Sequence, residues 1–148
     1  MRNIFRRAVV IAVTAVLAAG GFAAAGGELA TTGEPDARFI LRTADIDGTM
    51  GFIGAGGEID RVINPTLAVE EGDLVELVLL NGNGMSHYFI IEELGVGAAA
   101  ISEVGDRTIV RFVAEESGTF TYSCALADHW RSGMIGRLVV AEATQANL

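Results

Sequence analysis

Beyond residue 36 the chain alternates between short apolar runs and turns rich in Gly, Asn and Asp. Short apolar runs bounded by such residues predict β-strands, because strands are brief and the turns between them need permissive residues. About eight such runs at this spacing favour an all-β sandwich or barrel. The candidate strands are Arg38–Thr43, Met50–Ile53, Thr66–Val69, Leu74–Leu80, His87–Ile91, Thr108–Val113, Thr119–Cys124 and Arg137–Ala141.

The segments between these runs contain clear turn signals. Each predicted turn includes glycine, which tolerates the positive φ that tight turns often need. Residues 94–106 interrupt the rhythm with Gly95, Gly97 and three successive alanines, so we expect a loop with a short helical turn there. The predicted turns are Asp47-Gly48, Glu71-Gly72-Asp73, Asn81-Gly82-Asn83-Gly84 and Ser117-Gly118.

Two of the predicted strands also indicate which way their side chains point. In the run that ends at Cys124, the residues Phe120, Tyr122 and Cys124 share one face, since side chains alternate along a strand. The thiol is therefore expected to point into the sandwich with two aromatic rings. The run Leu74–Leu80 is apolar on both faces apart from Glu76, which is typical of a central strand with only partial solvent contact.

The first residues have the composition of an export signal. Arginines at 2, 6 and 7 precede an Ala/Val run over 8–19, and Ala23-Ala24-Ala25 is a cleavage candidate. The sequence predicts a signal peptide over 1–25, a flexible linker over 26–36, one domain over 37–143 and a C-terminal tail over 144–148. The protein is then exported, to the periplasm or another extracytoplasmic space. A retained leader would instead tether it to the membrane; with the leader removed, no membrane span is expected.

The charge of the chain is strongly acidic. All ten basic residues are arginine and three of them precede residue 26, so 7 arginines face 19 acidic residues beyond it, a formal charge of −12. This sign excludes nucleic acid as the expected partner, because nucleic-acid affinity depends on neutralising phosphates. It suits a partner protein with a basic docking surface, or it simply maintains solubility.

The chain has one cysteine and two histidines. An exported protein with a single cysteine forms no internal disulfide, so the thiol is free, paired between chains or bound to a metal. Cys124, His129 and Met134 lie on one short segment, and His87 lies upstream. One thiolate, two imidazoles and one thioether are the ligand set of a mononuclear blue-copper electron-transfer site. Taken singly, each of these residues is more often a core or surface residue than a metal ligand. All four together, in this order, favour a metal site.

Spacing and residue type narrow the choice of metal. Four residues separate Cys124 from His129, and four separate His129 from Met134. A structural zinc site is not expected, because the chain has no second cysteine and the Cys–His step is too wide for a zinc clip. A thioether is a soft ligand that suits copper. The fourth ligand, His87, must come from a distant strand, so the site forms only when the chain folds.

These residues resemble those of a known family. Tyr-Ser-Cys at 122–124, the histidine at 129 and Gly-Met-Ile-Gly-Arg-Leu-Val-Val at 133–140 resemble the cysteine loop and last strand of cupredoxins, including plastocyanin-like blue-copper proteins. The stretch from Asp47 through Ile63-Asn64-Pro65 to His87 resembles the first cupredoxin domain of copper nitrite reductases and multicopper oxidases. The resemblance covers roughly residues 38–141. It implies a Greek-key β-sandwich and assigns one type 1 copper ion to His87, Cys124, His129 and Met134.

Three positions depart from what the resemblance implies. In nitrite reductases the first histidine motif continues with an aspartate and a second histidine that serve the catalytic copper; here those positions are Ile90 and Glu92. The chain also has no third histidine, so we expect an electron carrier and not an enzyme. Tyr88 stands where many cupredoxins have an asparagine that braces the ligand loop. Trp130, next to His129, is a candidate docking residue, or else it packs the loop and shields the metal.

The sequence therefore predicts an exported one-electron carrier with redox protein partners. Two alternatives stay open. One is a copper carrier without electron transfer. The other is the subunit, encoded as a separate chain, through which electrons enter a nitrite reductase or multicopper oxidase system.

Overall fold

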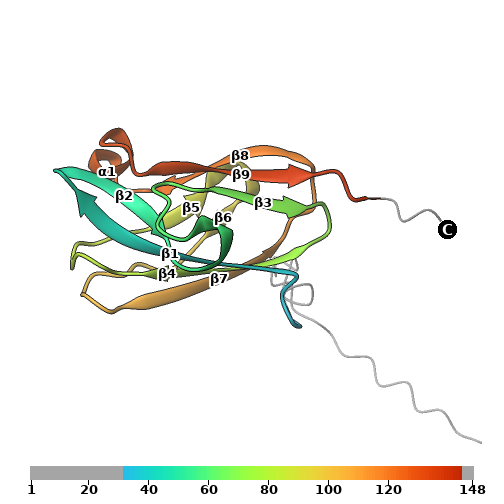
Figure 1. Ribbon diagram of the computed structural model, residues 1–148, viewed down its shortest axis with the longest axis horizontal. Coiled ribbons are helices and arrows are strands. Elements are labelled where there is room, and N and C mark those ends of the chain that lie inside the picture. Colours follow the sequence, from blue (N-terminus) through green and yellow to red (C-terminus); the bar gives the residue numbers. More distant parts are fainter. Residues whose placement is uncertain (1–31, 145–148) are drawn as a thin grey trace, which may run out of the picture.

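Two β-sheets packed face to face make up the computed structural model, which describes residues 32–144 (Figure 1). Within these residues the strands are β1 (Ala37–Ile46), β2 (Thr49–Gly54), β3 (Thr66–Glu70), β4 (Leu74–Leu80), β5 (Phe89–Ile91), β6 (Val96–Gly97), β7 (Arg107–Val113), β8 (Gly118–Cys124) and β9 (Ile135–Ala141). The helical elements are the 3₁₀ turns η1 (Gly57–Ile59) and η2 (Glu92–Leu94) and the helix α1 (Ala127–Arg131).

The two sheets have different strand orders. One sheet runs β2-β1-β4-β7 and the other β3-β9-β8-β5-β6. The pairs β1–β4 and β3–β9 are parallel, and the other pairs are antiparallel. This arrangement confirms the predicted all-β sandwich. It has nine strands where about eight were expected, because the two residues of β6 pair with β5.

The interruption predicted over 94–106 is partly different from what we expected. The helical turn is present, but as η2, which ends at Leu94. The chain then returns antiparallel to β5, pairing Ile91 with Val96 and Ile90 with Gly97. Two residues are too few to show an alternating pattern, so the sequence carries no signal for β6.

Aromatic rings fill the core between the sheets at the end near α1. Phe52 of β2, Phe89 of β5 and Tyr122 of β8 are completely buried, and their ring centroids lie 5.5–6.0 Å apart. The predicted inward face of β8 is confirmed, because Tyr122 and Cys124 are buried and Phe120 is half-buried. The cysteine thiol therefore enters the core beside these rings.

The central position of β4 is also confirmed, with one difference. Glu76 was expected to keep solvent contact, but it is only 3% exposed. Arg38 of β1 and Arg111 of β7 stand directly opposite it in the two flanking strands. Arg38 Nε lies 2.6 Å from Glu76 Oε1, and Arg111 Nε donates to Glu76 Oε2 at 2.7 Å. The pairing register thus places two cations over the carboxylate.

The ends of the chain are described only in part. The predicted signal peptide at 1–25 lies outside the described residues, as does the tail beyond Thr144. In the last residues of the predicted linker, Asp36 N donates to Leu74 O and Asp36 Oδ2 accepts from Leu74 N, both at 2.9 Å. Between residues 32 and 144, no helix is long and apolar enough to cross a membrane.

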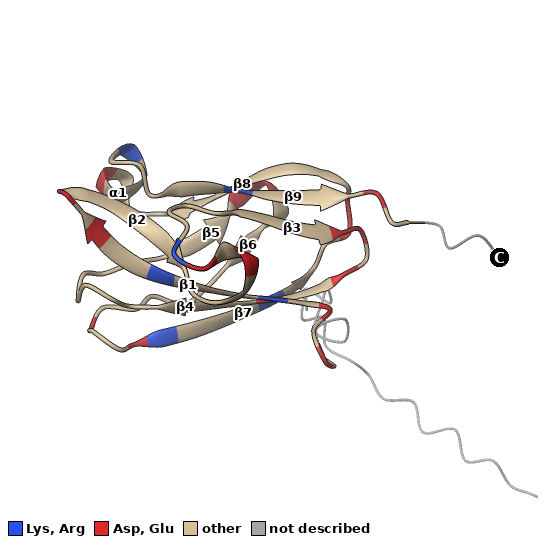
Figure 2. Cartoon of the chain, viewed as in Figure 1, with Lys and Arg blue, Asp and Glu red and all other residues tan. Residues whose placement is uncertain are grey.

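The acidic charge is unevenly distributed. Figure 2 shows acidic segments gathered at the end of the sandwich opposite α1, where β3 and β9 end and β4 begins. Glu71, Glu115 and Glu142 line one depression at that end. The candidate ligands lie at the other end, where α1 carries Asp128 and the turn between β1 and β2 is also acidic.

Candidate metal centre

The segment between β8 and β9 carries three of the four predicted ligands. Cys124 is the last residue of β8, His129 lies in α1, and Met134 immediately precedes β9. The five-residue helix was not predicted, since it is too short to show helical periodicity. It is closed by hydrogen bonds from His129 N to Leu126 O at 3.0 Å and from Ser132 N to Asp128 O at 3.1 Å. The helix turns the His129 side chain back toward Cys124.

His87 reaches the same place from the strand next to β8. The expected strand began at His87, whereas β5 begins at Phe89. His87 instead forms an isolated bridge with Ile101, with N–H···O distances of 2.8 and 3.1 Å. Phe89 pairs with Cys124 in the register of β5 and β8. This register brings the two candidate ligands together, although 37 positions separate them.

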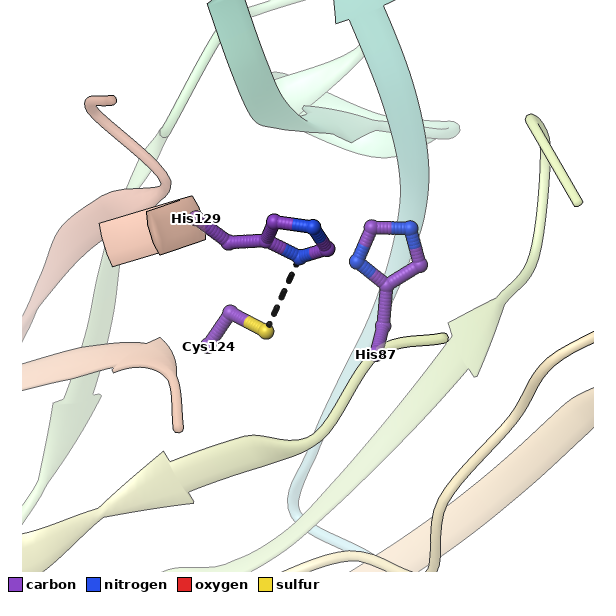
Figure 3. Close-up of side chains that lie close together, drawn as sticks. All are labelled: His87, Cys124 and His129. Carbon is purple, nitrogen blue, oxygen red and sulfur yellow. Dashed lines mark hydrogen bonds between the residues drawn. The ribbon is translucent and has the colours of Figure 1, made fainter. Parts of the chain in front are cut away.

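The three side chains converge on one point, as Figure 3 shows. A ring nitrogen of each histidine and the Cys124 sulfur all lie within 4.8 Å of one another. His129 Nδ1 is 3.6 Å from Cys124 Sγ, and the two imidazole centroids are 4.9 Å apart. Cys124 and His87 are completely buried, while His129 is half-buried. The predicted meeting of these three residues is thus present in the structure.

The two nitrogens of His87 have different surroundings. Nε2 is 2.8 Å from Asn83 Oδ1, which can only accept, so Nε2 carries the proton. Nδ1 is buried and has no hydrogen-bond partner among residues 32–144. A buried polar atom without a partner is costly, unless a ligand satisfies it. Burial, and secondarily the charge of His129, lower the pKa of His87 from 6.5 to about 4, which keeps the ring neutral.

The side chains that hold His87 were not predicted. Asn83 Oδ1 also accepts from Met85 N at 3.2 Å, and Asn81 Nδ2 donates to Met85 O at 2.8 Å. The hydroxyl of Thr43 in β1 contacts both asparagine oxygens at 3.4 Å. The Asn-Gly repeat at 81–84 predicted only a turn. A side chain that orients a ligand has no sequence signature of its own here.

Met134 is placed by its main chain. Its N–H donates to His129 O at 3.0 Å, and its carbonyl accepts from Cys124 N at 3.2 Å. Its side chain is completely buried. Both neighbouring ligand candidates are therefore bonded to the Met134 backbone. That its sulfur is the axial ligand stays a prediction.

A second set of supports comes from the segment before β3. Tyr122 Oη donates to Pro65 O at 2.6 Å, two residues before Cys124. Asn64 Nδ2 donates to Gly133 O at 2.8 Å, one residue before Met134. Residues 64 and 65 therefore contact the ligand segment on both sides. The Asn-Pro pair indicated only a turn in the sequence.

The remaining residues of interest lie near the surface. Trp130 is 45% exposed, and the Arg131 guanidinium lies 5.5 Å from its ring centroid. Tyr88 is 40% exposed and contributes its carbonyl, which accepts from Ala125 N at 2.9 Å. Ile90 is half-buried in β5, and Glu92 is exposed in η2. Whether Trp130 belongs to a docking face stays a prediction.

Solved structures identify the class of this fold. Auracyanin B matches with a TM-score of 0.55 and 19% identity, covering 74% of this chain and 92% of that one. Copper nitrite reductase from Nitrosomonas europaea matches with a TM-score of 0.53 and 22% identity, covering 76% and 43% of the two chains. The multicopper oxidase Fet3p matches with a TM-score of 0.52 and 15% identity, covering 74% of this chain and 32% of that one. The chain has the cupredoxin-like fold that the sequence predicted.

The sequence of the chain is similar to those of copper-containing nitrite reductases. The chain is 41% identical over 111 residues to the copper-containing nitrite reductase of Alcaligenes xylosoxydans xylosoxydans, covering 66% of this chain and 32% of the relative. It is 42% identical over 86 residues to that of Pseudomonas chlororaphis, covering 51% and 24%. It thus spans a third or less of these relatives' lengths. No family model matches the chain.

Proposed function

We propose that this protein binds one copper ion through His87, Cys124 and His129, with Met134 as the axial ligand, and carries single electrons between redox partners. The observation that supports this most directly is the buried meeting of two imidazoles and one thiol, with the Nδ1 of His87 left without a partner. The copper proteins among its relatives and fold neighbours support the choice of metal.

The spacing of the three donors fits a metal ion. Metal–nitrogen and metal–sulfur bonds of about 2.0–2.3 Å, in a trigonal arrangement, separate the donors by about 3.5–4 Å. The 3.6 Å between Cys124 Sγ and His129 Nδ1 lies in this range. His₂Cys with a weak axial thioether is the ligand set of blue copper, whereas structural zinc sites use four cysteine or histidine ligands.

The chain's own part is to hold these donors still. Copper, when bound, supplies reversible one-electron chemistry, and the protein tunes it through hydrogen bonding and burial. Cys124 is fixed by β8, His87 by Asn83 and the bridge to Ile101, and His129 by α1. The half-exposed ring of His129 is the route by which an electron reaches solvent-side partners.

The test is an absorption spectrum of the protein with one equivalent of Cu(II). We expect an intense visible charge-transfer band that a mild reductant bleaches and an oxidant restores. Cys124→Ser removes the band because it removes the thiolate, while Met134→Leu keeps it with a changed reduction potential. Colourless copper that chelators remove readily would contradict electron transfer and favour a copper carrier.

We propose an electron carrier, not a self-contained nitrite reductase. Both histidines of the chain are already used in the His87–Cys124–His129 group. Ile90 and Glu92 replace the two residues that the resemblance would assign to a catalytic copper. Nitrite consumption by the purified copper-loaded chain with a reductant would contradict this assignment.

A second candidate follows from the sequence relatives. The 41% identity covers only a part of a nitrite reductase, so the chain is also suited to act as a separate electron-delivering subunit of such a system. Copurification of a larger copper enzyme with this chain, and faster turnover of that enzyme on its addition, would support this function. An enzyme unaffected by the chain would remove it.

Docking is proposed at the end that carries the ligands. Met85, Tyr88 and Trp130 are each 40–45% exposed and lie within two residues of a candidate ligand. Because these three exposed side chains carry no charge, we propose that apolar contact dominates docking while the acidic charge of the chain attracts a basic partner at long range. Trp130→Ala should slow electron transfer to the partner and leave the spectrum intact; a lost spectrum would instead indicate that Trp130 packs the loop.

Export to the periplasm completes the proposal. It depends on the basic and Ala-rich composition of residues 1–25. N-terminal sequencing of the protein from fractionated cells tests it. We expect a new terminus near residue 26 in the periplasmic fraction, and an intact terminus in the membrane fraction would indicate a retained anchor.

A further inference from the structure

Asn64 connects the ligand segment to the opposite sheet. It lies between η1 and β3 and is half-buried, with φ at +48°. Its side-chain oxygen accepts from Phe52 N in β2 at 3.0 Å, and its side-chain nitrogen donates to Gly133 O at 2.8 Å. Its backbone N–H also donates to Phe52 O. Both polar atoms of the side chain are thus used, one on β2 and one on the segment between α1 and β9.

The bond to Gly133 acts on the peptide group that leads into Met134. The carbonyl end of this peptide is held by Asn64 Nδ2, and its N–H end is held by His129 O at 3.0 Å. Gly133 has φ at +106°, a conformation that glycine adopts freely. The segment already holds Gly133 in part, because Gly133 N donates to Trp130 O at 3.1 Å and Gly133 O also accepts from Ile135 N at 2.9 Å. The bond from Asn64 adds a restraint from outside the segment and ties this peptide to β2.

We propose that Asn64 is a positioning residue for Met134, and that it sets the reduction potential of the copper by fixing where the thioether stands relative to Cys124 and His129. This inference rests on the proposed function, in which Met134 is the axial ligand. A weak, long axial bond is sensitive to small displacements of the ligand, and the potential of such sites depends on it.

Two substitutions of Asn64 remove different parts of its side-chain hydrogen bonding. Asn64→Gly suits the positive φ and removes both side-chain bonds. Asn64→Asp keeps the acceptor for Phe52 N–H but replaces the donor to Gly133 O with an oxygen. Arg61→Gly is the matched control, because Arg61 also has positive φ, at +62°, but its side chain is exposed and bonds nothing in the ligand segment. Each variant is loaded with copper and compared with the wild type.

We expect both Asn64 variants to lose about tenfold in copper affinity and to change the relative intensities of their visible bands. If the tenfold loss of affinity affects only one oxidation state of copper, the reduction potential shifts by about 59 mV. Arg61→Gly should match the wild type. In a Met134→Leu background, Asn64→Gly should no longer shift the potential, because its effect passes through the thioether.

Three results would overturn the inference. One is an unchanged potential and spectrum in folded Asn64→Gly and Asn64→Asp, even with a lower melting temperature, because that shows a purely structural role. Another is an equal shift in Arg61→Gly. The third is a shift that persists with Met134→Leu. In each case the wild type still has its visible band, whereas a wild type without that band would mean that the proposed function itself is wrong.

Discussion

Acidification should destabilise the metal-free protein through His87. Burial lowers the pKa of this ring from 6.5 to about 4, with a smaller contribution from His129. Between these two values the unfolded chain binds a proton that the folded chain does not, so the free energy of unfolding rises with pH in this window and falls as the pH is lowered. Above pH 6.5 His87 is neutral in both the folded and the unfolded chain, so it does not lower the free energy of unfolding. As the pH falls from 6.5 toward 4, the free energy of unfolding falls with it.

The size of the effect follows from the pKa difference. At 1.36 kcal/mol per pKa unit, the drop to about 4 corresponds to about 3 kcal/mol at most. His87 is completely buried, but the half-exposed His129 beside it leaves water close to one edge of the site. We therefore expect a loss of about 2 kcal/mol between pH 7 and pH 4.5 from this group.

Urea unfolding of the metal-free protein at the two pH values measures this loss. The matched variant is His87→Phe, which keeps a buried ring but does not titrate. The acidic residues are common to both proteins, so their contribution cancels in the difference. The wild type should lose about 2 kcal/mol more than the variant on acidification. Equal losses in the two proteins, or a greater loss in the variant, would refute the assignment of a buried neutral imidazole.

Three further predictions concern the sandwich around the site. Glu76→Gln removes the carboxylate between two arginines, so we expect the free energy of unfolding in urea to fall by about 1–2 kcal/mol. A variant as stable as the wild type would show that solvation of the arginines fully replaces the two ion pairs. Tyr122→Phe leaves Pro65 O without its donor and should cost about 1–2 kcal/mol, while an unchanged midpoint would mean that water replaces the hydroxyl. In Gly136→Ala the new Cβ would lie 2.1 Å from Tyr122 Cζ, so the ring must move. We expect a loss of about 1–3 kcal/mol in thermal unfolding, and a neutral result would mean that the ring shifts freely.

The sequence predicted more of the fold than of the contacts around the candidate site. The alternation of Phe120, Tyr122 and Cys124 was sufficient to place the thiol in the core, because side-chain direction in a strand depends only on local period. Residue type was sufficient to select three side chains, His87, Cys124 and His129, that converge in the structure. The short elements β6 and α1 were missed, since two and five residues do not establish a period.

The contacts that orient the candidate ligands could not be predicted. Asn83 and Asn64 both lie in segments whose composition indicates turns and nothing more. Their hydrogen bonds to His87 and to Gly133 O depend on where the two sheets place these turns. The pairing of Arg38 and Arg111 across Glu76 is of the same kind, because it depends on strand register.

By itself, then, the sequence determined which chemical groups are available and which way a strand presents them. Both are local properties of a chain with a fixed side-chain alternation. Only the tertiary structure decided that Phe89 pairs with Cys124, which brings His87 to the thiol, and that Asn64 meets Gly133 across 69 positions of sequence. Such contacts depend on packing and register between distant strands, and no local pattern encodes them.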